Sequence, residues 1–186
     1  MRPLTIKANM LHQFLIFIAM LTLLAVSPPS GLALEGTEDQ IKSAMMVNFI
    51  KFIQWPESVI QETGGLITIG VFCDDHFEHA LGPVQGRTVG TYHLAVRRIN
   101  DLNQLTGCQV LFICASEAHR ASLVFSKVNG LPILTIGEDE AFLRSGGIIR
   151  FYTEKNHIRF EINKTAALGA NLQISAKLIE IAEVFE

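Results

Sequence analysis

Three short stretches of almost continuous apolar sequence constrain the fold most. They are GGLITIGVFCDD, with a strand expected over residues 66–72, CQVLFICAS, which begins at Cys108, and LPILTIG, which ends at Gly137. A strand that lacks alternation of polar and apolar residues is covered on both faces, as in parallel sheets. Between the second and third stretches, EAHRASLVFSKVNG has a helical pattern with Ser116 as its N-cap and a glycine at its end. The pattern therefore predicts parallel strands connected by helices.

The remaining segments extend this core. TYHLAVRRIN alternates apolar and polar residues and predicts a strand with one exposed face, and GIIRFYTEKNHIRFEIN predicts an antiparallel hairpin around the turn Glu154–Asn156. Asn163 is expected to cap a short helix in KTAALGA, and Ser175 a last helix through AKLIEIAEVF. The order predicts an α/β fold. It is a single domain with a mainly parallel, open, Rossmann-like sheet, helices on both faces and, in the C-terminal half, an antiparallel hairpin at one edge.

The first 33 residues have the order of charged, apolar and small residues that is typical of a secretory signal peptide. Arg2 and Lys7 precede the apolar run Phe14–Val26, and SPPSGLA follows it. The run has 13 residues, whereas a helix that spans a bilayer needs roughly 20. We therefore expect cleavage after Ala33, export of the protein, and a single domain over residues 34–186.

The charge of the expected domain excludes one class of function. Removal of Arg2 and Lys7 leaves 13 basic against 18 acidic residues, so the formal charge changes from −3 to −5. A mildly acidic domain without a run of basic residues lacks the positive surface that binds phosphate backbones. We expect no nucleic-acid partner.

The three cysteines allow two interpretations. Cys73 ends the expected strand 66–72, while Cys108 opens and Cys114 ends the strand in CQVLFICAS. If these strands are parallel neighbours, Cys73 and Cys114 lie at matching ends, with Cys108 about 20 Å away. Because an exported protein meets oxidising conditions, a disulfide between Cys73 and Cys114 is one interpretation. Three buried, inert thiols are the other.

The sequence offers little catalytic chemistry. CDDHFEH places His76 and His79 three residues apart but supplies no third metal ligand, and CASEAH lacks the glycines of a nucleophile elbow. Neither a dinucleotide fingerprint nor a phosphate-binding loop is present. We expect no catalytic residue, metal or cofactor. A small ligand could still bind in a crevice at the strand ends near Asp74, Ser116 and Glu138.

The segment AMMVNFIKFIQWP, residues 44–56, predicts a helix that is apolar over about twice the ~100° arc needed to cover one core. Asn48 lies within this arc, where a buried amide is expected to bond to nearby backbone. One side of the helix is expected to cover the sheet through four residues: Met45, Phe49, Phe52 and Trp55.

The other flank of this helix, Met46, Ile50 and Ile53, is then left without a partner. Burying three such side chains contributes several kcal/mol at ~25 cal/mol per Å². One hypothesis is that this flank packs in a homodimer or against a partner protein. The competing hypothesis is that the C-terminal helix covers it within one chain.

Three ordered motifs resemble the YfiR family of small periplasmic proteins. They are KSAMMVNFIKFIQWP, ILTIGEDEAFLRSGGIIRF and IRFEINKTAALGANLQISAKLIEIA, and the resemblance covers roughly Gln40 to Ala182. It implies a dimeric, non-enzymatic periplasmic protein that represses a membrane-anchored signalling protein, of the diguanylate cyclase or sensor kinase type, and so lowers cyclic di-GMP output. The alternative is a periplasmic sensor of a small ligand.

The family's best-known member is regulated through its disulfides. The present chain has no cysteine pair in its Gly-Gly hairpin region, where that repressor has its second disulfide. The resemblance therefore implies repression by contact more strongly than redox control.

Overall fold

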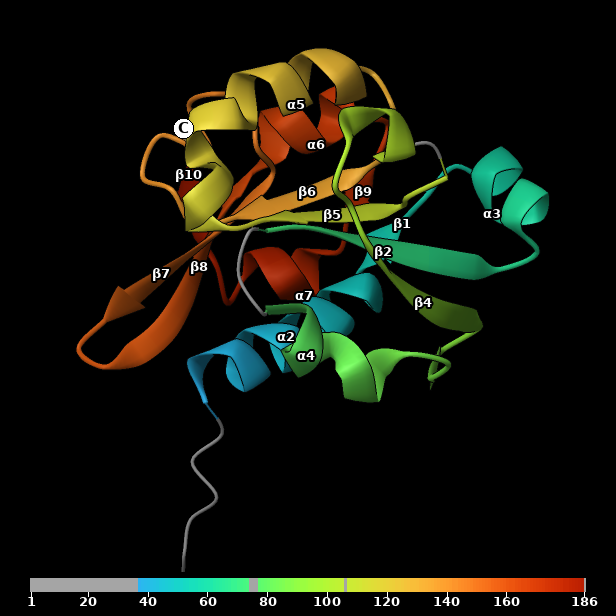
Figure 1. Ribbon diagram of the computed structural model, residues 1–186, viewed down its shortest axis with the longest axis horizontal. Helices are drawn as coiled ribbons and strands as arrows, with labels where there is room; N and C mark the ends of the chain where they lie inside the picture. Colours follow the sequence, from blue (N-terminus) through green and yellow to red (C-terminus); the bar gives the residue numbers. More distant parts are fainter. Residues whose placement is uncertain (1–36, 74–76, 106, 186) are drawn as a thin grey trace, which may run out of the picture. The chain divides into compact units, whose positions relative to one another are not determined.

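The computed structural model describes residues 37–73, 77–105 and 107–185 (Figure 1). The expected signal peptide, residues 1–33, lies outside the described residues, as do Asp74 and His76. Along the described part of the chain, no helix is both long enough and apolar enough to cross a bilayer.

Within the described residues, eight strands form the central sheet, in the order β10-β8-β7-β6-β5-β2-β4-β3. The parallel part comprises β2 (Leu66–Phe72), β4 (Tyr92–Arg98), β5 (Val110–Ile113), β6 (Leu134–Gly137) and β7 (Ile149–Glu154). The other three strands are β8 (His157–Asn163), antiparallel to β7, β3 (Thr88–Val89), antiparallel to β4, and β10 (Glu183–Phe185), parallel to β8. The mainly parallel α/β sheet with a C-terminal hairpin is confirmed, although β10 rather than the hairpin forms that edge.

Helices cover both faces of this sheet. Figure 1 shows α2 (Glu38–Ile50), α4 (Phe77–Leu81) and α7 (Ala176–Ile179) on one side, and α5 (Ala121–Val128) and α6 (Lys164–Gly169) on the other. Shorter elements complete the chain: α3 (Glu57–Thr63), the 3₁₀ helices η1 (Gly82–Val84), η2 (Leu102–Leu105) and η3 (Ala115–Arg120), and a small sheet of β1 (Ile53–Gln54) with β9 (Gln173–Ile174). Along β5 the side chains alternate between two cores, Phe112 packing with the α2 side and Leu111 with the α5 side.

The first helix begins with a capping box and ends earlier than its apolar pattern predicts. Thr37 Oγ1 accepts the Gln40 N–H while Gln40 Oε1 accepts the Thr37 N–H. The helix stops at Ile50, and Ile53 then pairs in an extended conformation with β9. Pro56 favours extended backbone in the residue before it, which ends any helix at that point. The prediction of a continuous helix to Trp55 was therefore wrong.

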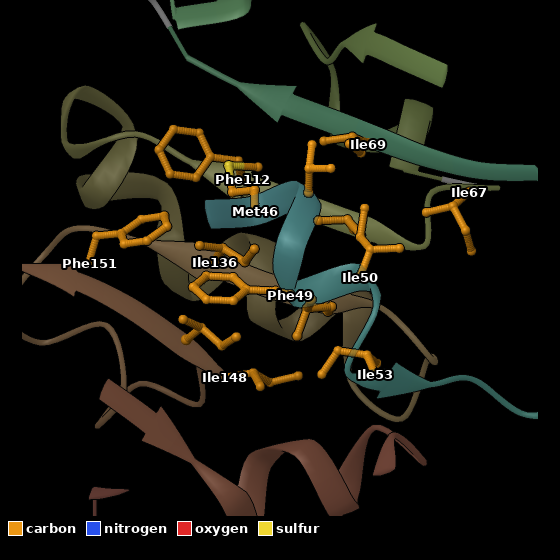
Figure 2. Packing of buried hydrophobic residues seen from close by; sticks show 14 of the residues in the cluster. Met46, Phe49, Ile50, Ile53, Ile67, Ile69, Phe112, Ile136, Ile148 and Phe151 are labelled. Carbon is orange, nitrogen blue, oxygen red and sulfur yellow. The ribbon is translucent and has the colours of Figure 1, made fainter. Parts of the chain in front are cut away.

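The flank expected to be free is buried within the chain. Met46 and Ile50 are fully buried and Ile53 is 2% exposed, in one core cluster with Phe112 of β5 and Leu178 of α7 (Figure 2). The hypothesis that Met46, Ile50 and Ile53 bind a partner was wrong, and cover within one chain is confirmed. The error came from the helix boundary, because Ile53 lies on β1 and not on the helix. The buried face of the helix contains Phe49 together with Met46 and Ile50, while Met45 lies outside it.

The polar residues of α2 are also placed differently from the prediction. Asn48 is exposed, and its Oδ1 accepts a hydrogen bond from Lys51 Nζ at 2.9 Å, so a buried role for this amide was wrong. The buried polar residues are instead Lys42 and Ser43. Since Lys42 is one turn before Met46, the buried stripe begins closer to the N-terminus than the apolar residues alone indicate.

Three predicted helix termini have different outcomes. Asn163 caps α6, its Oδ1 accepting the Ala166 N–H at 2.9 Å, as expected. Ser116 lies inside η3 and not at the N-cap of α5. The last helix begins after Ser175 but ends at Ile179, because Glu183–Phe185 forms β10 in register with β8. Tertiary pairing overrides a helical pattern here.

Trp55 connects β1 to the start of the central strand β5. Its indole Nε1 donates to the Gln109 carbonyl at 3.3 Å, and its ring meets Tyr92 edge-on with centroids 5.9 Å apart. The same Gln109 carbonyl also accepts the Leu134 N–H at 2.8 Å. One backbone group therefore joins β1, β5 and β6.

Replacement of Ile50 by Lys is expected to lower the free energy of unfolding by at least about 3 kcal/mol, because it removes core packing and buries an unpaired charge. Ile41→Lys, on the same helix at a side chain that is 42% exposed, is the matched control and should change it by less than about 1 kcal/mol. Urea denaturation monitored by circular dichroism measures both, and equal stability of the two variants would contradict the burial of Ile50.

Trp55→Phe is expected to cost about 1 kcal/mol, because the Gln109 carbonyl keeps its second donor when the indole N–H is lost. Trp55→Ala should cost about 3–5 kcal/mol, since most of the packed ring disappears. Thermal unfolding of the two variants separates the contribution of the hydrogen bond from that of the packed ring. Equal losses would show that the hydrogen bond, and not the packing, is the main contribution of Trp55.

Candidate functional site

The sheet has a topological switch point between β2 and β5. The chain visits the parallel strands in the order β2, β4, β5, β6 and β7, but β4 lies on one side of β2 and β5 on the other. Open α/β sheets bind ligands in the crevice outside the carboxyl ends of the strands at this point. The residues that follow β2 and β5 are therefore the first place to look for a site.

A disulfide bridges this crevice. Cys73 follows β2 and Cys114 follows β5, and the two are bonded, with Cα atoms 5.2 Å apart. Both side chains are buried, while Cys108, at the other end of β5, is a buried free thiol. Of the two interpretations of the cysteines, the Cys73–Cys114 disulfide is the one in the structure.

Glu138, directly after β6, is held by an ion pair. Its Oε1 pairs with Lys42 Nζ of α2, its Oε2 accepts the Ala115 N–H at 3.3 Å, and Lys42 also pairs with Glu38 at 2.6 Å. Burial alone would lower the pKa of the Lys42 ammonium, but the hydrogen bonds and charges of Glu138 and Glu38 outweigh it and raise this pKa. Glu138 therefore fastens α2 to the strand ends.

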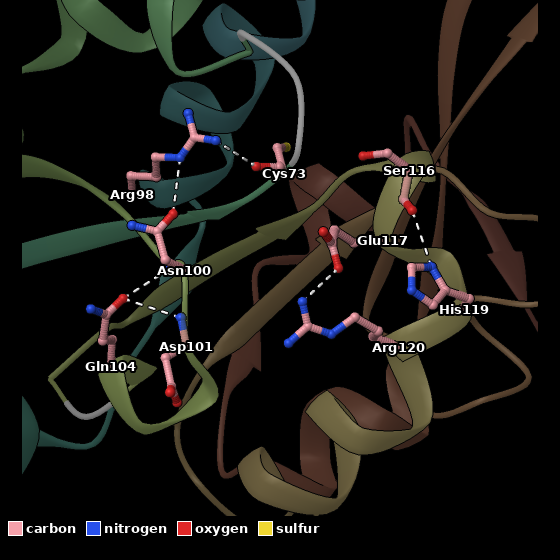
Figure 3. A network of polar contacts seen from close by, with 9 residues as sticks. All are labelled: Cys73, Arg98, Asn100, Asp101, Gln104, Ser116, Glu117, His119 and Arg120. Atoms are coloured by element: carbon pink, nitrogen blue, oxygen red, sulfur yellow. Dashed lines mark hydrogen bonds and ion pairs between the residues drawn. The ribbon is translucent and has the colours of Figure 1, made fainter.

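Ser116 and its neighbours form a structural turn after β5. The His119 Nδ1–H donates to the main-chain carbonyl of Ser116 at 3.2 Å, which is not the geometry of a base that activates a hydroxyl (Figure 3). The buried Glu117 carboxylate accepts from Arg120 Nη1 at 3.2 Å, and the Arg120 guanidinium lies 4.6 Å from the centre of the Phe72 ring. These contacts fix the turn against the sheet.

Arg98 closes the other side of the disulfide, and sequence reasoning missed this role. Its Nη2 donates to the Cys73 carbonyl at 3.3 Å and its Nε donates to Asn100 Oδ1 at 3.1 Å (Figure 3). Its Nη1 pairs with Glu78 at 3.1 Å. The only sequence signal was a charged residue at the end of an otherwise alternating strand.

Of the three residues expected to line a ligand crevice, the structure describes two, Ser116 and Glu138. Ser116 and Glu138 come close through Ala115, whose N–H bonds to Glu138, while Asp74 lies outside the described residues. Among the described residues, no group of three or more His, Cys, Asp or Glu side chains is arranged to hold a metal ion. His79 is exposed, and its expected companion His76 is not among the described residues.

An apolar hollow lies at the far end of α2, where the hairpin β7–β8 meets the segment after α7. It has a volume of about 290 Å³, and its lining is shared equally between polar residues and the apolar Met45, Ile158, Phe160, Ile181 and Ala182. Ile181 is 69% exposed, and Ile41, one helical turn before Met45, is 42% exposed. The free apolar flank of the first helix is thus Ile41 and Met45, opposite to the flank that the sequence predicted.

Carboxylates surround this apolar hollow. Glu154, Glu180 and Glu183 line it together with one arginine, Arg159, which lies 3.7 Å from Glu154. Tyr152 Oη donates to Glu183 Oε2 at 2.7 Å, and burial together with this carboxylate raises the pKa of Tyr152 to about 12. The tyrosine therefore stays a neutral donor that links β7 to β10.

Comparisons with known proteins address fold and family. A crystal structure of a conserved domain protein from Vibrio cholerae has a similar fold, with a TM-score of 0.53 and 9% sequence identity. The match covers 80% of this chain and 60% of that one, so this chain spans about three fifths of its length. No curated protein matches the sequence. The sequence profile of the YfiR/HmsC-like family matches residues 39–183, nearly all of the described residues, and the chain belongs to that family.

Proposed function

We propose that this protein is a non-enzymatic periplasmic regulator that binds a membrane-bound signalling enzyme of the diguanylate cyclase type and lowers its output by contact. Membership of a family of periplasmic regulators supports this proposal, and the disulfide is compatible with an oxidising compartment. The observation that carries it is the apolar hollow, because a protein that acts by association needs an accessible apolar surface.

The apolar hollow has the composition of a docking site. Ile181 and Ile41 present branched apolar side chains to solvent, and Met45 and Ile158 lie half-buried between them and the core. Met45 adapts its shape easily, because it is unbranched and has several rotatable bonds. Met45 and Ile158 already pack beside the core, so a partner could cover them together with the exposed Ile41 and Ile181 without any rearrangement of the core.

The charges around the apolar hollow favour a different protein over a second copy of this chain. A two-fold axis through the hollow would place the same surface on both sides, so two linings that each carry three glutamates and one arginine would come together. Like charges brought together at an interface are unfavourable. The partner is therefore a segment with an apolar ridge flanked by Lys or Arg, and the homodimer that the family resemblance implies would use another surface.

Ile181→Glu and Met45→Glu are expected to abolish regulation while the protein stays folded, because Ile181 is exposed, Met45 is only half-buried and a charge at either position disfavours docking. In the native host, deletion of the gene should raise cyclic di-GMP several-fold. The wild-type gene should restore the original level, and neither variant should do so. Leu123→Glu is the control, since Leu123 is 56% exposed on α5, on the opposite side of the sheet.

A direct measurement accompanies the cellular one. The purified protein is titrated with the purified periplasmic domains of the host's own diguanylate cyclases, and one domain should bind the wild type and the Leu123→Glu variant but neither hollow variant. Full repression by Ile181→Glu and Met45→Glu would refute the hollow as the docking site. Unchanged cyclic di-GMP after deletion would refute the proposed target class.

A further inference from the structure

A second and larger cavity, of about 710 Å³, lies at the amino ends of β5 and β6. This is the end of the parallel strands opposite to the disulfide. Its lining comes from α3, from the loop around η2, from the last turn of α5 and from the segment before β6. Its volume is within the range of pockets for small organic ligands. The cavity is separate from the switch-point crevice that the disulfide bridges, and it is a second candidate site for a ligand.

The walls of this cavity are mainly apolar. Val59, Leu102 and Leu131 are accessible or half-buried there, and Pro132 and Ile133 continue the surface towards the core. Leu131 is 45% exposed, although β6, which begins three residues later, is buried along its whole length. An apolar ligand would cover this side chain without displacing any of the protein's own contacts.

One buried side chain directs hydrogen-bond donors into the cavity. Gln109 is 4% exposed, and its Oε1 accepts the Thr68 N–H at 2.9 Å, which fixes the orientation of its amide. Among the described residues, Gln109 Nε2 has no hydrogen-bond partner. Every fully buried side-chain nitrogen or oxygen among them has one, so Nε2 is not fully buried. Nε2 is therefore open to the cavity that Gln109 lines, and an acceptor oxygen is needed to satisfy its two N–H groups.

The charged residues of the lining are one cation and one anion. Lys127 of α5 and Glu62 of α3 are both exposed at the cavity. The thiol of Cys108, also in the lining, is already engaged by Arg97 Nη2 at 3.0 Å. Because these two charges are opposite, the N–H donor of the buried Gln109 decides which ligand the cavity prefers. We propose that the cavity binds a small monocarboxylate with an apolar body, whose carboxylate accepts from Gln109 Nε2.

Octanoate is a suitable probe, because it combines an eight-carbon body with one carboxylate. Titration of the purified protein, followed by nuclear magnetic resonance, should give saturable shifts of the Gln109 side-chain amide and of the Leu131 and Ile133 methyl groups. Octanol and octylamine carry the same chain without the anion, and each should bind at least about tenfold more weakly. Tighter binding of octylamine would mean that Glu62 dominates and would overturn the proposal.

Gln109→Glu tests the donor directly. The substitution keeps an acceptor for the Thr68 N–H but replaces Nε2 by oxygen, so octanoate should bind at least about tenfold more weakly while the melting temperature without ligand shows that the fold persists. Leu131→Trp should also weaken binding by filling the cavity, whereas Leu123→Trp, outside it, should not. Unchanged octanoate affinity in both Gln109→Glu and Leu131→Trp, or shifts confined to residues elsewhere, would refute the site.

Discussion

The packing of α2 on the sheet determines which surfaces of this protein are available to other molecules. Met46, Phe49 and Ile50 enter the core, and the Phe49 ring lies 5.6 Å from that of Phe151 and 4.8 Å from that of Phe160. The ion pair between Lys42 and Glu138 fixes the rotation of the helix about its axis. With that rotation set, the large apolar residues of the helix that stay outside the core are Ile41, which is exposed, and Met45, which is half-buried.

The parallel core could be predicted from the sequence because its strands are apolar on both faces and the helices between them have clear terminal signals. The matching of Cys73 with Cys114 followed from the same reasoning, since parallel neighbours align their carboxyl ends. What could not be predicted depended on contacts between distant segments. The pairing of Ile53 with Ile174 and of Val184 with Ile162 converts helical patterns into strands, and no local signal marks either pair.

The candidate sites show the same difference between what local sequence indicates and what contacts between distant segments decide. Residues after β5 and β6 were expected to form a crevice, but the structure uses them for internal contacts: Glu138 for Lys42, and the segment around Ser116 for a turn. The cavity at Gln109 could not be found from sequence, because its lining comes from four separate segments and its decisive group is a buried amide in an apolar run. Composition identifies which residues are apolar, while topology decides which of them share a surface.

The disulfide makes the full stability of the protein depend on oxidation of its cysteines. It links two strands whose cysteines are 41 residues apart in sequence. Closing a loop of that length removes chain entropy from the unfolded state equivalent to about 4 kcal/mol in the simplest treatment. Under reducing conditions Cys73 and Cys114 stay thiols and the chain lacks this contribution. The folded state therefore reaches its full stability only in a compartment where the bond can form.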